Sequence, residues 1–361
     1  MAHFNTKRRS SFQQKSYQGK KKLVLIYTPL FDRTPWPGLE YSYNFTHFRG
    51  KPCPVRNCLI SYNKSRVKDS DAVLFHARDL PSAFELAKIP RTSRQRWAFL
   101  VHENPFFSYK NLSEYNHLFN WTMTYRTDSD FFVPYNYYRR LTPEELSTIE
   151  EPKNYAAKKD KLVAWMVGHC GKPRDHVVQQ LSMYLNVTVF GACAKHFNQT
   201  GNHCRRGSRR CSSLLRRFKF YLAFENAMCV DYVTEKYWYT PFDHDMVPVV
   251  LGSNYGPEVA IPGSFINVLD FKSVRALAEY LNYLDANDSA YNAYFLWKTK
   301  YKVEYSLPVV WTCNICAALN NNSVPTSIYH DLGSYWGVNT CGKNQDKLDN
   351  LLQGVVQSGT F

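Results

Sequence analysis

Short apolar runs separated by helix-length segments constrain the fold of this chain most strongly. In the first half they cover residues 23–27, 72–75, 98–101 and 122–125. The second half repeats the pattern with LVAWMV from residue 162, a helical stretch over 173–185, then VTVFG, FKFYLAFEN and MVPVVLG. Such alternation is typical of buried parallel strands joined by helices, with ligand sites at the carboxyl ends of the strands. We therefore expect an α/β fold with two Rossmann-like domains facing a cleft.

The length and a polar stretch predict where the domains divide. At 361 residues the chain exceeds the usual size of a single core. Residues 142–161 are rich in Pro, Lys and Glu and lack apolar periodicity, which favours a junction there. The expected parts are a basic disordered tail over 1–22, domains over 23–150 and 151–310, and an extension over 311–361 that packs back on them.

Positive charge is concentrated in two segments. The formal net charge is +15, and residues 1–22 and 205–219 each hold seven Lys or Arg with no acid. One interpretation is a solvated tail and loop; the other is contact with an anionic ligand or a membrane surface. No nucleic-acid motif accompanies the charge, so nucleic acid is not an expected partner.

Glycosylation acceptors and cysteines indicate a secretory protein. Asn-x-Ser/Thr occurs eight times, at Asn44, Asn63, Asn111, Asn120, Asn186, Asn198, Asn287 and Asn321. Ten cysteines include close pairs at 53/58, 204/211 and 313/316, and we expect several disulfides. Zinc is the competing interpretation of the C-x-x-C at Cys313 and Cys316, although a second ligand pair at finger spacing is missing.

The amino-terminal segment does not have the pattern of a membrane anchor. Its first 22 residues carry positive charge without an apolar core, and the apolar run over 23–27 is too short to cross a bilayer. We expect neither a signal peptide nor a membrane span in this chain.

The segment FENAMCVDYVTEK, residues 224–236, carries the densest candidate chemistry. A strand is predicted to end at Phe224 and a helix to begin near Thr234. A helix N-terminus with Lys236 suits a diphosphate, and Glu235 suits ribose hydroxyls. The alternative is a capping box in which Glu235 only satisfies helix donors.

This segment, followed by MVPVVLG, resembles the donor-binding signature of the α1,3/4-fucosyltransferases, glycosyltransferase family 10. FHARDLP from residue 75, HENP from 102, FNWTMTYRTDSDFFVPY from 119, VAWMVGHC from 163 and PGSFINVLDF from 262 extend the resemblance. It implies a GT-B type fold, with the acceptor bound by the first domain and GDP-fucose by the second. It also implies inverting transfer of L-fucose to the 3-hydroxyl of N-acetylglucosamine, on a core N-glycan or a lactosamine antenna, in the Golgi lumen, where relatives are type II membrane proteins.

Matched to the family motifs, Glu103 is the expected general base, which takes the proton of the acceptor hydroxyl. Arg174 and Lys236 are expected to stabilise the leaving diphosphate. The family positions that hold ribose, phosphates or fucose match Asn226, Tyr232 and Glu235, with Glu225 beside them. An acceptor-side motif matches His76, Arg78 and Asp79, whose alternative role is to cap a strand.

The metal and the acceptor leave alternatives open. Asp-x-Asp occurs three times, at 69/71, 128/130 and 243/245, so no single pair is diagnostic of a manganese site. The resemblance implies no essential cofactor, with Mn²⁺ at most a stimulating ion. The segment Gly168-His169-Cys170, Asn136 and Ala77 depart from the usual motifs, which leaves the acceptor undecided. A metal-dependent glycosyltransferase using another nucleotide sugar and an inactive glycan-binding paralogue are the alternative functions.

Overall fold

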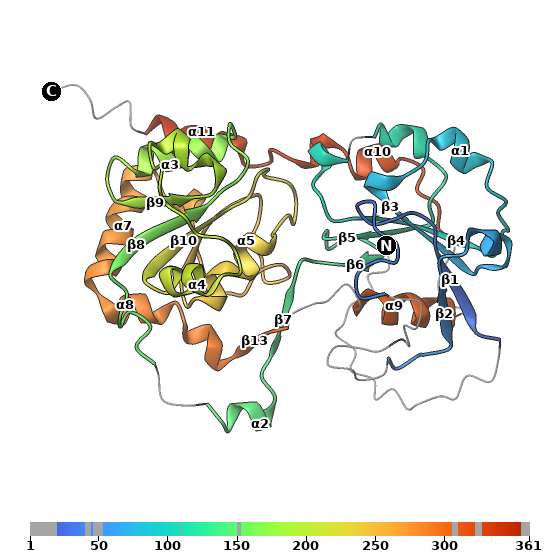
Figure 1. The fold of residues 1–361 in the computed structure, drawn as a ribbon, viewed down its shortest axis with the longest axis horizontal. Coiled ribbons are helices and arrows are strands. Elements are labelled where there is room, and N and C mark those ends of the chain that lie inside the picture. Colours follow the sequence, from blue (N-terminus) through green and yellow to red (C-terminus); the bar gives the residue numbers. More distant parts are fainter. Residues whose placement is uncertain are drawn as a thin grey trace. The chain divides into compact units, whose positions relative to one another are not determined.

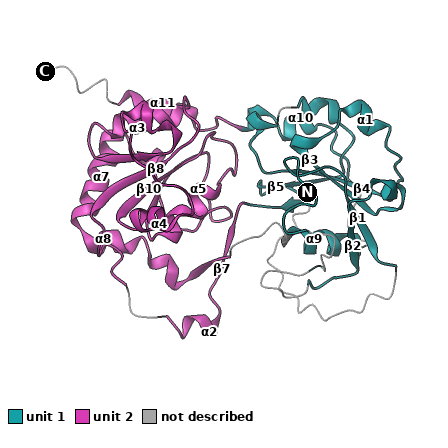
Figure 2. Ribbon diagram, viewed as in Figure 1, with its two compact units in different colours: residues 1–134, 305–340 teal, residues 135–304, 341–361 magenta. Residues whose placement is uncertain are grey.

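The computed structural model describes residues 20–39, 45, 53–108, 110–149, 153–304, 310–321 and 327–354. The predicted disordered tail lies outside these residues, apart from its last three. Two compact units make up the chain, one from 1–134 and 305–340 and the other from 135–304 and 341–361 (Figure 2). We call them unit 1 and unit 2.

Unit 1 is built on a six-stranded parallel sheet. Its order is β2-β1-β3-β4-β5-β6, with bounds Cys58–Ser61, Lys22–Ile26, Ala72–His76, Arg96–Val101, Trp121–Thr124 and Phe131–Phe132. The central strand β3 is buried along its whole length, because residues on both faces of the sheet are covered. All four strands expected in the first half are confirmed.

Short helices and 3-10 turns surround this sheet. They are η2 (Lys64–Asp69), η3 (Ala77–Asp79), α1 (Ala83–Ala87), η4 (Pro105–Phe107), η5 (Leu112–Tyr115), α9 (Val310–Leu319), α10 (Leu332–Tyr335) and η9 (Val338–Thr340) (Figure 1). Helix α9 joins the core through Trp311, whose ring lies 6.1 Å from that of Trp36, and through the buried Ile315.

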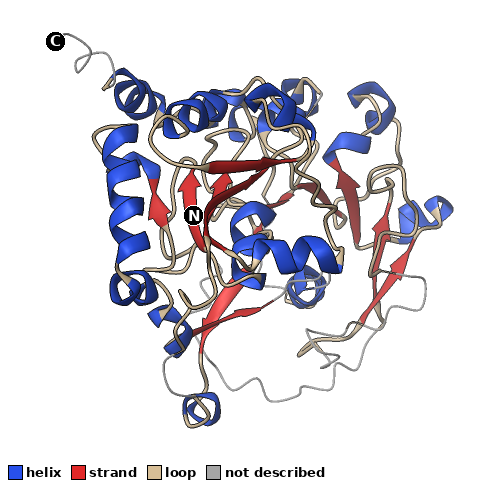
Figure 3. Cartoon of the chain, turned by 60° about the vertical axis from the view of Figure 1, so that its left-hand side comes forward, coloured by secondary structure: helices blue, strands red, loops and turns tan. Residues whose placement is uncertain are grey.

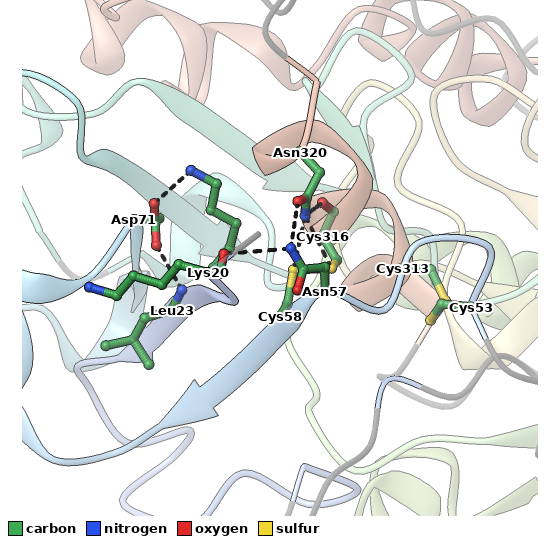
Figure 4. Close-up of a disulfide and its surroundings, with 10 residues drawn as sticks. Lys20, Leu23, Cys53, Asn57, Cys58, Asp71, Cys313, Cys316 and Asn320 are labelled. Carbon is green, nitrogen blue, oxygen red and sulfur yellow. Dashed lines mark hydrogen bonds and ion pairs between the residues drawn. A yellow bond between two sulfur atoms is a disulfide. The ribbon is translucent and has the colours of Figure 1, made fainter. Parts of the chain in front are cut away.

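Two disulfides attach α9 to the amino-terminal part of unit 1 (Figure 4). They join Cys53 to Cys313 and Cys58 to Cys316. The side-chain amide of Asn57 donates to Asn320 Oδ1 at 3.4 Å and adds to the attachment. The zinc interpretation of the C-x-x-C is therefore wrong, because both of its sulfur atoms are bonded to other cysteines.

Unit 2 contains a second parallel sheet, of five strands. Its order is β12-β11-β10-β8-β9, with bounds Ile266–Asn267, Val247–Leu251, Phe218–Phe224, Lys161–Met166 and Val187–Phe190. Helices lie beside these strands (Figure 3). They are α3 (Pro173–Leu181), η6 (Ala192–Phe197), α4 (Arg209–Leu215), α5 (Glu235–Trp238), α6 (Thr240–Asp243), η7 (Val268–Asp270), α7 (Val274–Ala286), α8 (Asp288–Ala293), η8 (Leu296–Thr299) and α11 (Gln345–Gln353). The strands expected in the second half are confirmed, and with them the α/β class and the two Rossmann-like units.

The units divide at different residues from those predicted. Strand β7 (Tyr137–Arg140) pairs antiparallel with β13 (Tyr301–Glu304), and α2 (Pro143–Leu146) follows β7. Arg139 forms ion pairs with Glu145 and Glu304, so residues 135–149 belong with unit 2 rather than unit 1. The expected extension over 311–361 is also split, because 310–340 packs in unit 1 and 341–354 in unit 2.

Three further disulfides lie in unit 2, between Cys170 and Cys193, Cys204 and Cys211, and Cys229 and Cys341. Among the described helices, none combines the length and the apolar character needed to cross a bilayer.

Candidate active site

The candidate donor site lies at the carboxyl end of β10 in unit 2, where Glu225 follows the strand. Its side chain is fully buried. The carboxylate accepts the backbone N–H of Thr234 at 2.8 Å and the Thr234 hydroxyl at 2.8 and 3.0 Å. Burial raises the pKa of Glu225, while Lys236 and Thr234 oppose that rise. A buried acid therefore ties the end of β10 to the start of α5.

Lys236 projects into the same place. Its Nζ lies 3.2 Å from Glu225, 3.3 Å from Glu235 and 2.8 Å from the Thr234 hydroxyl. Burial acts to lower the pKa of Lys236, but Glu225 and Glu235 outweigh it and raise the pKa above its usual value. Lys236 remains about one fifth exposed, at 22%, so this permanent cation is open to a ligand.

Arg174 supplies a second cation, from the second residue of α3. The side chain is 6% exposed, and its terminal nitrogens donate to the carbonyls of Phe224 at 2.7 Å and His169 at 3.2 Å. Its Nε has no hydrogen-bond partner among the described residues. Burial lowers the pKa of Arg174, and Glu225 and Asp175 oppose this. The guanidinium therefore joins the turn after β8 to the end of β10, while its Nε–H, 4.0 Å from the Asp175 carboxylate, makes no hydrogen bond there.

The sequence-based cradle at a helix N-terminus needs correction. Helix α5 has only four residues, and the backbone N–H of its cap, Thr234, is bonded to Glu225. One helical turn has little macrodipole, so side-chain charge and not the helix must supply most of the attraction for an anion. The capping box is not found either, since Glu235 is the first helical residue and contacts Lys236.

The loop between β10 and α5, residues 226–233, carries the other predicted donor residues. Asn226 is half-buried, and Tyr232 is 3% exposed, with its ring 6.1 Å from Tyr135. Asp231 has a positive φ of 59° and is fixed by a reciprocal pair with Asn254. The Asp231 N–H donates to Asn254 Oδ1, and Asn254 Nδ2 donates to the Asp231 carboxylate, both at 2.7 Å.

A disulfide holds the other half of this loop. Cys229 is bonded to Cys341, and the Gly342 N–H donates to the Met228 carbonyl at 2.9 Å. The Tyr232 N–H donates to the Cys229 carbonyl at 3.1 Å. The loop is therefore held at Cys229 by the carboxyl-terminal segment and at Asp231 by the turn after β11.

The candidate acceptor residues gather in unit 1, at the carboxyl end of β3. His76 is 2% exposed, and its Nδ1 forms a short hydrogen bond with Asp79. Asp79 also accepts the Phe31 N–H at 3.0 Å, and the exposed Arg78 lies 5.1 Å from the Phe31 ring centroid. Burial lowers the pKa of His76, against the opposing effect of Asp79. The buried Asp-His pair therefore fixes the end of the strand, as the capping alternative predicts, and a role in acceptor binding stays a prediction.

Glu103 follows the neighbouring strand, β4, and is half-buried. His76 is level with Leu100 in the register, so Glu103 and the Asp-His pair lie at the same edge of adjacent strands. His102 Nε2 donates to the Val133 carbonyl at 2.9 Å, and burial lowers the pKa of His102 to about 4. Asn104 is fully buried. Glu103 therefore lies in the chain between a half-buried histidine and a fully buried asparagine.

One aspartate of each Asp-x-Asp pair forms ion pairs or hydrogen bonds with other residues of the protein. Asp71 contacts Lys22, Asp245 contacts Lys153 and Lys298, and Asp130 accepts from Thr122 and Tyr329. Within the described ranges, no group of three or more His, Cys, Asp or Glu is arranged to hold a metal ion. A stimulating Mn²⁺ site therefore finds no support among the residues that the structure describes.

Comparison with known proteins identifies the family of this chain. A family described as "Glycosyltransferase family 10 (fucosyltransferase) C-term" matches residues 156–336, and "Fucosyltransferase, N-terminal" matches residues 19–136. The chain belongs to glycosyltransferase family 10. It is therefore a fucosyltransferase by family, as the sequence motifs indicated.

Two relatives and one solved structure illustrate the membership. The Alpha-(1,3)-fucosyltransferase C of Drosophila melanogaster is 30% identical, over 91% of this chain and 80% of the relative. The human 4-galactosyl-N-acetylglucosaminide 3-alpha-L-fucosyltransferase FUT6 is 36% identical, over 74% of this chain and 72% of the relative. A crystal structure of an alpha1,3-fucosyltransferase with GDP-fucose shares the fold, with a TM-score of 0.51 at 17% identity, covering 88% of this chain and 94% of that one.

Sequence reasoning missed two parts of the donor site. Glu225 was placed beside the site without a role, although a single acid directly after a seven-residue buried strand signals a buried, paired carboxylate. Asn254 was not considered, and nothing in one sequence links it to Asp231, 23 residues earlier.

Proposed function

We propose that the chain transfers L-fucose from GDP-fucose to the 3-hydroxyl of an N-acetylglucosamine residue in a glycoprotein glycan, with inversion at the anomeric carbon. The activities for which the relatives are named support this linkage, and the GDP-fucose complex of an alpha1,3-fucosyltransferase with the same fold supports this donor. The single observation that carries the proposal is the gathering of two cations at the carboxyl end of β10, where Lys236 pairs with Glu225 and Arg174 donates to the Phe224 carbonyl.

In the proposed reaction the acceptor 3-hydroxyl oxygen forms a bond to the fucose anomeric carbon. The bond from that carbon to the β-phosphate oxygen breaks, and its electron pair leaves with GDP. Glu103 takes the acceptor proton. Lys236 and Arg174 stabilise the charge that grows on the diphosphate, because fixed cations at the leaving group lower the barrier more than mobile ones.

The remaining residues are proposed to bind rather than to react. Glu235 suits the ribose hydroxyls, and Asn226 and Tyr232 suit the phosphates or the fucose. In unit 1, His76, Arg78 and Asp79 suit acceptor hydroxyls. The five disulfides are typical of an oxidising compartment, and the Golgi lumen is the proposed site of action.

The test is an assay of fucose transfer from GDP-fucose in the presence of EDTA. N-acetyllactosamine and an N-glycopeptide with a terminal N-acetylglucosamine antenna are offered in parallel, and mass spectrometry locates the fucose. We expect transfer to at least one of them. Absence of transfer to both contradicts the proposal, and loss of transfer on adding EDTA supports a metal-dependent reaction instead.

A further inference from the structure

Phe106 is a large apolar side chain presented to solvent next to the proposed base. Its exposed fraction is 57%. It comes three residues after Glu103, a path of at most about 10 Å even for an extended chain. Exposure of one apolar side chain is common on protein surfaces, so the position of Phe106 and the way it is held carry the argument.

The turn that carries Phe106 is held rigidly. Asn104 caps the 3-10 turn η4 from a fully buried position, and its Oδ1 accepts the Phe106 N–H at 3.1 Å. The Phe107 N–H donates to the Asn104 carbonyl at 2.9 Å, and the Ser108 hydroxyl donates to the Pro105 carbonyl at 2.9 Å. A buried cap and a proline thus fix the backbone from which an exposed ring projects.

The face of this ring is open. Within the described part of the chain, no aromatic ring or cation lies against it. Phe84 on α1, which is 70% exposed, is different because Lys88 Nζ lies 3.8 Å from its ring centroid. Val338, 57% exposed, belongs to η9, which lies near η4.

We infer that Phe106 is a stacking platform for a hexopyranose ring that flanks the reacting N-acetylglucosamine in the acceptor. The C–H groups on one face of such a sugar carry partial positive charge and are apolar. They are attracted to the negative face of an aromatic ring. Glu103 must contact the reacting sugar, so a ring three residues further along reaches the neighbouring sugar. This inference rests on the proposed function.

The experiment compares two acceptors and two phenylalanines. Transfer from GDP-fucose is measured with a β-linked N-acetylglucosamine monosaccharide and with N-acetyllactosamine, using wild type, Phe106→Ala, Phe106→Tyr and Phe84→Ala. We expect Phe106→Ala to lower kcat/KM for lactosamine about tenfold, to leave the monosaccharide unchanged, and to leave the KM for GDP-fucose unchanged. Phe106→Tyr keeps an aromatic ring, so its kcat/KM for lactosamine should stay close to the wild-type value. Phe84→Ala should also keep the wild-type kcat/KM, because Phe84 lies elsewhere in the sequence.

The outcomes separate this inference from the proposed function. An equal loss for both acceptors, or no loss for lactosamine, overturns the stacking platform while the wild-type enzyme remains active. An equal effect of Phe84→Ala overturns it as well, because any exposed ring then suffices. Absence of transfer by the wild type to every acceptor overturns the proposed function itself.

Discussion

Lys236 keeps its positive charge in a place where burial alone favours the neutral amine. Glu225 and Glu235 supply the opposing field, so the side chain is ready for an anion without a change of protonation. Diphosphate oxygens then compete with these carboxylates for the same ammonium group. The backbone N–H and the hydroxyl of Thr234 both donate to the Glu225 carboxylate and offset the free energy lost when it is buried.

Replacing Lys236 tests its role in the donor site. We expect Lys236→Ala to weaken GDP affinity at least tenfold, because it removes a charge-assisted contact and leaves Glu225 buried without its cation. Lys236→Arg keeps the positive charge, so we expect it to lose less affinity for GDP than Lys236→Ala does. Calorimetric titration with GDP measures this affinity, and Lys298→Ala, which breaks a partly buried ion pair with Asp245 elsewhere in unit 2, is the matched control. Unchanged affinity in Lys236→Ala contradicts the assignment.

Replacing Glu103 tests the proposed base. We expect Glu103→Gln to lower turnover at least about a hundredfold while GDP affinity is kept, because the amide cannot take a proton. Steady-state assays and GDP titration measure the two quantities. Glu114→Gln changes an exposed acid of the same unit and serves as the control. Turnover near the wild-type level in Glu103→Gln removes this residue from the reaction.

His102 makes the stability of the protein depend on pH. Its pKa is about 4 in the folded chain and ordinarily about 6.5, so the unfolded chain binds more protons between these values. Stability is therefore fully present above pH 6.5 and falls as the pH drops toward 4. We expect the free energy of unfolding, measured in urea, to be about 1–2 kcal/mol lower at pH 5 than at pH 7 because of His102. The variant His102→Gln should lose that part of the difference; an unchanged pH dependence contradicts the assignment.

At the scale of elements, a reciprocal pair of hydrogen bonds holds the loop over residues 226–233, the donor loop, at Asp231, and a disulfide holds it at Cys229. Asn254 accepts from the Asp231 backbone and donates to its carboxylate. Asn254→Asp removes the amide donor and leaves two carboxylates facing each other, so we expect it to raise the KM for GDP-fucose several-fold with a smaller change in kcat. Asp231→Asn keeps an oxygen that accepts from Asn254, so we expect a smaller change in this variant. The double variant exchanges the two side chains and restores both hydrogen bonds.

Recovery of the donor KM in that double variant distinguishes positioning from a general loss of packing. Donor KM values for the four proteins form a cycle that measures the coupling directly. Additive losses, with no recovery, contradict a positioning role for Asn254.

Elements were predictable where one physical signal dominated. Buried parallel strands such as β3, β4 and β10 are continuous apolar runs in the sequence. His76, Glu103 and Glu225 lie at or just after the ends of these strands, where the sequence predicts them. Helix α5 ends after one turn, at Trp238, and a second short helix with Pro241 in its first turn begins at Thr240. The proline is visible in the sequence, but the break at Tyr239 has no local signal. Contacts between distant segments, such as Asp231 with Asn254, leave no local pattern.

At the scale of the whole molecule, unit 2 depends on the last part of the chain. Leu348 and Leu351 of α11 are buried in its core, and Cys341 holds the donor loop. A chain that stops after Thr340 should therefore melt at a lower temperature and lose GDP binding. Stopping after Gly354 removes only 355–361 and is the control. Circular dichroism and GDP titration measure both variants, and a stable, GDP-binding short form contradicts this dependence.

The domain boundary was the least predictable feature. Polar composition over 142–161 pointed to a junction near 150, but the pairing of β7 with β13 carries residues 135–149 into unit 2. The pairing joins segments about 160 residues apart, as the ion pair of Arg139 with Glu304 shows. Composition reports solvent exposure, whereas a boundary depends on which distant segments pack together.

The disulfides of α9 have a consequence for biosynthesis. Cys53 and Cys58 are separated from their partners by 260 and 258 residues. At ordinary translation rates about 10 to 50 seconds pass before Cys313 and Cys316 are made. In an oxidising compartment such as the proposed one, the two thiols, five residues apart, can bond to each other during that interval. The pairing with Cys313 and Cys316 then requires thiol–disulfide exchange that opens such an early bond.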